Sequence, residues 1–321
     1  MDRLIYLAPD LTEIGPCRAD ADFDVGAKGT ASNDFVLKGI LPEGIGGVYV
    51  PGTEFGGMLE YLQTSNMNDV VTRKGFTWRG LLEQGVILPP SGSDYKIVSG
   101  EANTVMAGLL SGFMGGFFHV SAEASGIIID NYKFPLYCTY LEGLTGMLQE
   151  YDAKLVITAD KPSAGSGPVV TVQAKPRVTI GDKYSEEYPV SLTYTDDGMG
   201  INHLICLGQG SLQSRTRVDL YVQEDGTIGT QQYYTGFSER TEVYDYSSSE
   251  SESNLVTYGK RRLQERMSKK TLALNDADVD GDIGDLVYGY MRGISTTSPI
   301  TRKILTITGG IWKRESKIEG V

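Results

Sequence analysis

Histidine-based chemistry has few candidates in this chain, because its 321 residues include only His119 and His203. Two histidines are too few for a multi-histidine metal centre. His203 lies three residues before Cys206 in an alternating stretch, and side chains an odd number apart in a strand point to opposite faces. We therefore expect no catalytic His/Cys pair there and interpret both histidines as structural residues.

An acidic segment, residues 276–281, matches the opening of an EF-hand calcium loop, with acids at positions 1, 3 and 5 and glycine at position 6. The twelfth position is Val287, however, where that loop needs a bidentate Glu. An acidic turn leading into a strand at residues 285–288 is the better interpretation. The nucleophile elbow G-x-S-x-G and the phosphate-binding fingerprints are absent. The sequence thus predicts no catalytic residue, no metal ion, no cofactor and no enzyme activity.

One charged feature is predicted to be a contact surface. Residues 249–270 should form a helix that opens with a capping-box pattern, Ser249 and Glu252. Its narrow apolar stripe consists of Leu255, Gly259, Leu263 and Met267. Its outer face carries six cations against Glu265 alone, six minus one or +5, and these are Lys260, Arg261, Arg262, Arg266, Lys269 and Lys270. A plain solvated face is an equally good interpretation of this charge.

Composition narrows the class of protein. The chain has 29 Lys and Arg against 41 Asp and Glu, a net charge of −12, which disfavours a nucleic-acid binder. Forty per cent of the residues are hydrophobic and 22% are charged, which argues against disorder. The three cysteines show no metal spacing, as expected in a reducing compartment. No signal peptide or membrane-spanning helix is predicted.

The elements that must position these residues are mostly strands. Residues 1–90 contain short β-branched and aromatic runs cut by glycine, which predicts a first β-barrel. Residues 91–180 contain two helical patterns, one of them capped by Ser99, and then a hairpin, which predicts a small α/β module. Strand patterns return in residues 181–321, interrupted by the basic helix, and end in a hairpin turn at Gly309 and Gly310. The expected fold class is mainly β with an α+β insertion.

Several short motifs carry a resemblance to a known family. They are residues 52–57 (Gly-Thr-Glu-Phe-Gly-Gly), 75–82 (Gly-Phe-Thr-Trp-Arg-Gly-Leu-Leu), 93–95 (Ser-Asp-Tyr), 202–210 (Asn-His-Leu-Ile-Cys-Leu-Gly-Gln-Gly) and 282–287 (Asp-Ile-Gly-Asp-Leu-Val). In this order the chain resembles the tail-hub proteins of long-tailed bacteriophages. That family is similar in fold to the baseplate hub of contractile phages and to the hub of type VI secretion spikes.

The resemblance implies two tube-like antiparallel β-barrels with a small α/β module, assembled as a homotrimeric ring of pseudo-sixfold symmetry. Such a hub adapts the tail tube to the tail fibre or spike, and its implied partners are a distal tail or tail tube protein, the tape measure protein and the fibre or spike protein. DNA would be a partner only in passage through the channel. The protein would be made in the host cytoplasm and would reside in the virion, at the tail tip.

Two other classes of function are carried as alternatives. The first is a tail-associated hydrolase of cell-wall or surface glycan, which would usually carry its catalytic domain as an added module. Adjacent acids such as Asp196 and Asp197 fall in predicted turns and give no sign of the converging pair that a glycosidase needs. The second is a carbohydrate-binding β module, to which the 19 tyrosines lend support.

Overall fold

The computed structural model describes residues 3–27, 29–65, 68–161, 167–180, 191–247, 251–277, 279–291 and 294–318. The chain is mainly β and divides into two compact units. The larger unit comprises Met1–Leu192 and Ala273–Glu319, and the smaller unit comprises Thr193–Leu272 with Gly320–Val321. These units divide the chain at other places than the predicted domain boundaries at residues 90 and 180, which stay predictions.

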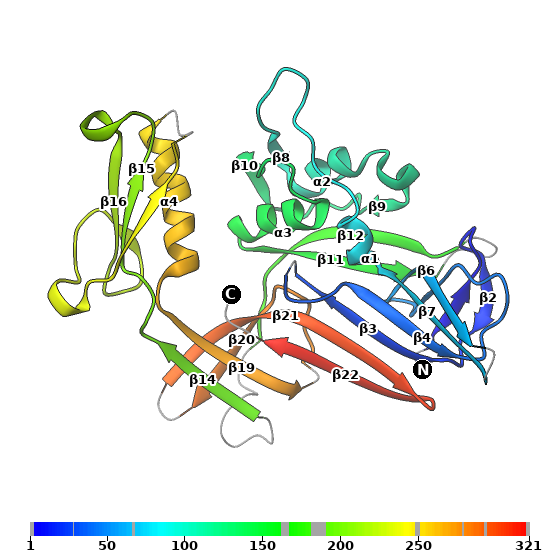
Figure 1. Cartoon of the computed structure of the whole chain (residues 1–321). Helices are drawn as coiled ribbons and strands as arrows, with labels where there is room; N and C mark the ends of the chain where they lie inside the picture. The colour runs from blue at the N-terminus through cyan, green and yellow to red at the C-terminus, as the bar shows by residue number, and fades with distance from the viewer. Residues whose placement is uncertain are drawn as a thin grey trace. The chain divides into compact units, whose positions relative to one another are not determined.

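The larger unit is built on a curled sheet that combines strands from both ends of the chain (Figure 1). Its N-terminal strands are β1 (Ile5–Leu7), β2 (Glu13–Pro16), β3 (Asp20–Gly26), β4 (Asp34–Gly39), β5 (Gly47–Tyr49), β6 (Gly56–Ser65) and β7 (Asn68–Thr77). Its C-terminal strands are β19 (Lys269–Ala277), β20 (Leu286–Met291), β21 (Ile294–Thr308) and β22 (Ile311–Ile318). The arrangement in two barrels stays a prediction.

The sheet order places the end of the chain beside its beginning. With β14 (Ser191–Asp197) the order is β14-β19-β22-β21-β3-β4-β7-β6-β5-β1-β2, and β20 pairs with both β21 and the short β13 (Thr179–Ile180). Strand β21 runs antiparallel to β3, from Arg302 opposite Gly26 to Ile307 opposite Ala21. A C-terminal strand is therefore an interior strand of the sheet.

Alternation along β3 separates a buried face from an outward face. Ala21, Phe23 and Val25 are buried, whereas Asp20 and Asp22 are exposed on the other face. A residue period of two along a strand produces this division. The buried face forms the interior of the larger unit, and the outward face carries charged side chains.

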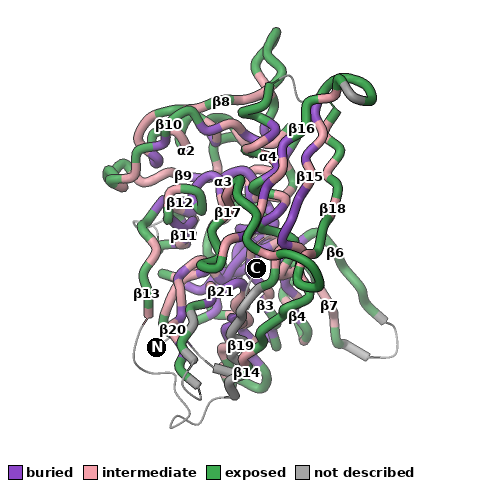
Figure 2. The backbone as a smooth tube through the Cα atoms, turned by 90° about the vertical axis from the view of Figure 1, so that its left-hand side faces the viewer, coloured by how far each residue is buried: buried purple, intermediate pink, exposed green. Residues whose placement is uncertain are grey.

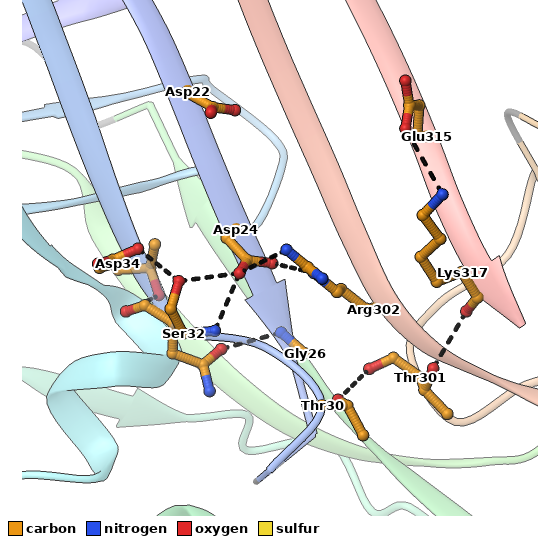
Figure 3. Close-up of polar contacts among 12 residues, drawn as sticks. Asp22, Asp24, Gly26, Thr30, Ser32, Asp34, Thr301, Arg302, Glu315 and Lys317 are labelled. Carbon is orange, nitrogen blue, oxygen red and sulfur yellow. Dashed lines mark hydrogen bonds and ion pairs between the residues drawn. The ribbon is translucent and has the colours of Figure 1, made fainter. Parts of the chain in front are cut away.

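A polar network on the outward face ties the loop after β3 to β21 (Figure 3). Arg302 Nη2 donates to Asp24 Oδ2 at 2.9 Å, and Ser32 donates to the same oxygen through its backbone nitrogen at 2.9 Å and its hydroxyl at 2.8 Å. Thr30 Oγ1 donates to the carbonyl of Thr301 at 2.9 Å. These bonds fix the two ends of the chain to each other beside the strand ladder.

The C-terminal hairpin is confirmed. Thr308 pairs with Ile311 across Gly309 and Gly310, whose φ angles are 57° and 82°. Two consecutive positive φ values define the type I′ turn, which glycine adopts without steric cost.

The α/β module is carried by the larger unit. Its strands are β8 (Ile97–Glu101), β9 (Phe118–Val120), β10 (Ile128–Lys133), β11 (Ala153–Asp160) and β12 (Val169–Pro176), and its helices are α2 (Ala102–Leu110), the 3₁₀ helix η1 (Phe113–Gly116) and α3 (Tyr140–Glu150). The two helices predicted in this region are present as α2 and α3, and Thr139 is the N-cap of α3. The cap predicted at Ser99 is wrong: α2 begins at Ala102, so its cap is Glu101, the last residue of β8, and Ser99 lies too early in that strand.

A large core cluster of the larger unit consists mostly of residues of this module, joined by Ile5, Leu7 and Tyr49 of the sheet, and buried residues are purple in Figure 2. Trp78, at the start of the short helix α1 (Trp78–Leu82), is fully buried and contacts Phe117 at a ring distance of 5.6 Å. Helix α3 contributes its apolar face to the same core, consisting of Leu141, Leu144, Met147 and Leu148. The helical spacing of these residues places them on one side of α3, which faces the interior.

A buried ion cluster fastens the module to the C-terminal segment. The Lys154 ammonium of β11 lies 2.8 Å from Asp282 Oδ2 and 2.6 Å from Asp285 Oδ2. Asp285 also accepts the backbone N–H groups of Val178 and Asp282. Burial raises the pKa of Asp282, but the Lys154 hydrogen bond and charge outweigh it, so that this pKa is lowered. Because Lys154 and Asp285 are both buried, each needs the other as a counter-charge.

Lys154→Met should lower the free energy of unfolding by about 3–5 kcal/mol, because Asp285 would be left buried without its cation. Urea unfolding of the whole chain measures this change. The matched control is Lys161→Met at an exposed position just after β11, which should stay within about 0.5 kcal/mol of wild type. Equal effects of the two substitutions would contradict the role of the cluster.

Glu101 provides a pH-dependent contribution to stability. Burial raises the pKa of its carboxyl, but hydrogen bonds from Ser125 and from the Thr104 N–H outweigh it and lower the pKa to about 2. The folded-state pKa is below the usual 4.5, so this stabilisation is present above pH 4.5 and is lost as the pH falls toward 2. The stability difference between wild type and Glu101→Gln should therefore shrink over this window in parallel urea titrations. A stability difference between the two proteins that does not depend on pH would contradict this role of the Glu101 carboxylate.

Candidate partner-contact surface

The smaller unit consists of a four-stranded sheet covered on one face by helix α4 (Figure 1). Its strands are β15 (His203–Leu207), β16 (Arg217–Val222), β17 (Ile228–Gly229) and β18 (Thr241–Asp245), in the order β17-β16-β15-β18. Helix α4 spans Glu252–Arg266. Three of the four residues of the predicted stripe are confirmed, since Leu255, Gly259 and Leu263 are buried against the sheet. Met267 lies just beyond the end of the helix and is partly buried against the same core.

Gly259 sets how closely α4 approaches the sheet. A Cβ atom at this position would lie 2.5 Å from Cys206 Sγ and 2.8 Å from Leu220 Cδ1. Both distances are shorter than a non-bonded contact of a Cβ atom allows. Only glycine therefore permits this packing without a shift of the neighbouring atoms. The close packing of α4 on the sheet therefore depends partly on the absence of a side chain at Gly259.

The start and the end of α4 differ from the prediction. The N-cap is Ser251, whose hydroxyl accepts from the Asn254 N–H at 3.2 Å, and Ser249 lies outside the described residues. The helix ends at Arg266, and Lys269 and Lys270 belong to β19. The predicted extension to residue 270 is wrong because strand pairing takes over after Met267, which already has an extended backbone.

Four of the six candidate cations lie on α4, and acids of the smaller unit contact three of them. Arg262 and Arg266, one turn apart, both bind Glu242 of β18, at 3.1 Å and 3.0 Å. Arg261 lies 3.8 Å from Glu265. Lys260 is exposed and makes no ion pair with a described residue. The four cations on α4 together with Glu242 and Glu265 carry a charge of four minus two, or +2. The predicted +5 also counted Lys269 and Lys270, whose side chains lie outside the described residues.

His203 is part of a buried polar cluster on the sheet. Its Nε2 lies 2.8 Å from Asp219 Oδ1, and its Nδ1 lies 2.8 Å from Glu239 Oε1. Its ring stacks on Tyr221 at 4.3 Å. Both ring nitrogens donate to carboxylates only when the imidazole is protonated.

Cys206 lies on the other face of β15, under Gly259 of α4. The structure therefore confirms that His203 and Cys206 do not meet. Sequence reasoning missed the link from His203 to these acids, because Asp219 lies on the paired strand β16 and Glu239 lies in the loop before β18.

The acidic segment does not assemble a cation site within the described part of the chain. Asp278 and the side chain of Asp276 lie outside the described residues. Asp282 and Asp285 bind Lys154, as described above. Among the described residues, no group of three or more His, Cys, Asp or Glu side chains is arranged to hold a metal ion.

Comparisons with known proteins identify the fold. No protein-family model matches the sequence, and no curated protein is similar to it. Among solved structures, a tail protein of Neisseria meningitidis MC58 matches with a TM-score of 0.56 and 12% identity, over 99% of this chain and 96% of that one. The prophage MuSo2 43 kDa tail protein of Shewanella oneidensis matches with a TM-score of 0.60 and 12% identity, over 100% and 98%. The prophage tail protein gp18 of Listeria monocytogenes EGD-e matches at 0.56 and 12%, over 100% and 95%.

The chain therefore has the fold of phage tail proteins, which confirms the resemblance seen in its motifs. The similarity covers nearly the full length of each chain, so it concerns the whole fold and not one shared module. In the described residues, no helix combines the length and the apolar character needed to cross a membrane.

Gly259→Ala should destabilise the smaller unit by about 1–3 kcal/mol, because the added methyl group overpacks the contact with Cys206. The matched control is Gly108→Ala in α2, where a Cβ meets nothing within 4 Å. There alanine should stabilise by about 0.5–1 kcal/mol through its higher helix propensity. Urea unfolding compares the two, and a stabilising Gly259→Ala would contradict the packing account.

Proposed function

We propose that this protein is a structural component of a phage tail, the hub at the tail tip or baseplate. The observation that carries the proposal is the full-length similarity in fold to three tail proteins from different bacteria. The proposed hub is a non-enzymatic homotrimer that adapts the tail tube or distal tail ring to the fibre or spike. Two barrels per chain would then give the ring its pseudo-sixfold symmetry. Its proposed location is the virion.

The charge of the chain supports a proposal about the channel. Three copies at −12 sum to −36, and an acidic wall would let DNA pass because like charges bring no counterion-release gain. A structure of the assembled ring with a basic or apolar wall would contradict this part of the proposal.

The basic face of α4 is the proposed contact with a neighbouring tail protein. Its described members are Lys260, Arg261, Arg262 and Arg266, and the side chains of Lys269 and Lys270 lie outside the described residues. Lys260 and Arg261 are the members best suited to meet a partner, since Arg262 and Arg266 hold Glu242 of their own unit. A partner with acidic side chains would fit this face.

Mass photometry of the purified protein, alone and with its neighbouring distal tail or tail tube protein, tests the hub. We expect a species with the mass of three 34.9 kDa chains. A chain that stays monomeric in both samples would refute the trimer. Incubation with peptidoglycan should release no reducing sugar, and such release would favour the hydrolase alternative.

The double substitution Lys260→Glu with Arg261→Glu should weaken binding of that neighbouring protein without unfolding the chain, because both side chains are exposed. The matched control reverses two exposed cations elsewhere, Lys38→Glu with Lys161→Glu. Pull-down of the partner and circular dichroism report binding and folding. Equal binding of the partner by both double variants would contradict the proposal that α4 forms part of the interface.

A further inference from the structure

The α/β module carries an exposed apolar patch. It consists of four large side chains with exposed fractions between 42% and 62%, which are Val86, Leu88, Leu136 and Tyr137. The two segments that carry them run side by side, since Val86 forms an antiparallel bridge with Thr139 and the Ile87 N–H donates to the Cys138 carbonyl at 2.9 Å. Ile87 and Cys138 are buried, so the residues that alternate with them face outward.

No charged residue interrupts this patch. Residues 85–93 read Gly-Val-Ile-Leu-Pro-Pro-Ser-Gly-Ser, and residues 134–141 read Phe-Pro-Leu-Tyr-Cys-Thr-Tyr-Leu. Contiguous exposed apolar patches are uncommon on proteins that stay monomeric, and they mark interaction sites. The centres of protein interfaces are likewise depleted of charge and enriched in tyrosine. The patch therefore has the composition of the centre of an interface.

The backbone of the patch is strained at Tyr137. The φ angle of this residue is 55°, in the left-handed region that bulky side chains rarely adopt. Its side chain is 60% exposed, so burial within the chain offsets little of the cost. Strained residues cluster at functional sites. The strain is thus a second observation, independent of composition, that points to a use for this surface.

A second exposed surface lies on the hairpin of β6 and β7. Residues 60–64 of β6 are exposed on both faces, whereas a strand that covers a core buries alternate residues. This part of the hairpin is therefore an arm that extends beyond the core of the larger unit (Figure 2). Its apolar side chains are Tyr61, Leu62 and Val70, with exposed fractions of 46%, 58% and 48%.

The arm and the patch differ in the sign of the charge beside them. On the arm, the Lys74 ammonium lies 5.7 Å from the centre of the Tyr61 ring. The patch is bordered by Glu83, three residues before Val86, and by Glu142, in the first turn of α3. Opposite charge at the borders of two apolar surfaces favours their association and fixes its orientation.

We infer that the arm of one copy of the chain docks on the patch of a second copy. This inference rests on the proposed homotrimer and names the contact that closes its ring. A ring of three needs a head-to-tail contact, in which two different surfaces meet, whereas patch against patch would give a two-fold dimer. Copies with a net charge of −12 repel each other, so a contact made by apolar side chains favours their association.

Sedimentation velocity of the whole chain over a concentration series tests the inference. The wild-type chain should form trimers. Leu88→Asp in the patch and Leu62→Asp in the arm should each weaken this self-association by about tenfold or more, because each places a charge in the apolar contact. The matched control is Ile311→Asp, which changes an exposed isoleucine outside both surfaces and should associate as wild type. Circular dichroism checks that each variant is folded.

A mixture of the two variants tests the pairing itself. Leu88→Asp keeps an intact arm and Leu62→Asp keeps an intact patch, so the mixture should contain a two-chain species that neither variant forms alone. A mixture without this species would overturn the pairing of arm with patch. Trimers that persist in both folded variants would overturn the inference and leave the hub proposal intact. Wild-type chains that stay monomeric at every concentration would overturn both the inference and a trimer formed by this protein alone.

Discussion

The pairing of β21 with β3 is the contact on which the larger unit depends. It brings Arg302 and Asp24, which are 278 residues apart, into one ion pair and sets the register of the neighbouring C-terminal strands. The entropic cost of closing so long a loop grows only slowly with length, but such non-local pairing slows folding. The outward network around Asp24 follows from this register.

In both units, oppositely charged side chains contact each other within the same unit. The chain carries a net charge of −12, and several of its described charges lie in small matched groups. Lys154 binds two aspartates, Glu242 binds two arginines, and His203 lies between two carboxylates. Burial makes the pairing of Lys154 with Asp285 obligatory, because a charge left alone in the interior is costly, whereas the arginines bound to Glu242 lie at the surface. The surface charge offered to a partner is therefore smaller than a count of residues indicates.

The parts of the fold that local physics determines could be predicted from the sequence. Two glycines in succession specify the turn at Gly309 and Gly310, and a helical period specifies the stripe from Leu255 to Leu263. The end of α4 could not be predicted, because Lys269 and Lys270 suit a helix locally and become strand only through pairing in the sheet. The charge of the candidate contact face could not be predicted either, because it depends on Glu242 of β18. Nor could the cluster of Lys154 with Asp285 be predicted. Each of these joins residues that only the tertiary fold brings together.

The place of the smaller unit within the chain has an evolutionary consequence. The chain leaves for this unit through β14 and returns through β19, and these two strands are neighbours in the sheet order. An insertion whose entry and exit are adjacent can be exchanged for another segment without rethreading the host fold. Lineages that share this sheet can therefore vary the inserted piece, by recombination at two nearby points, while inheriting the scaffold unchanged.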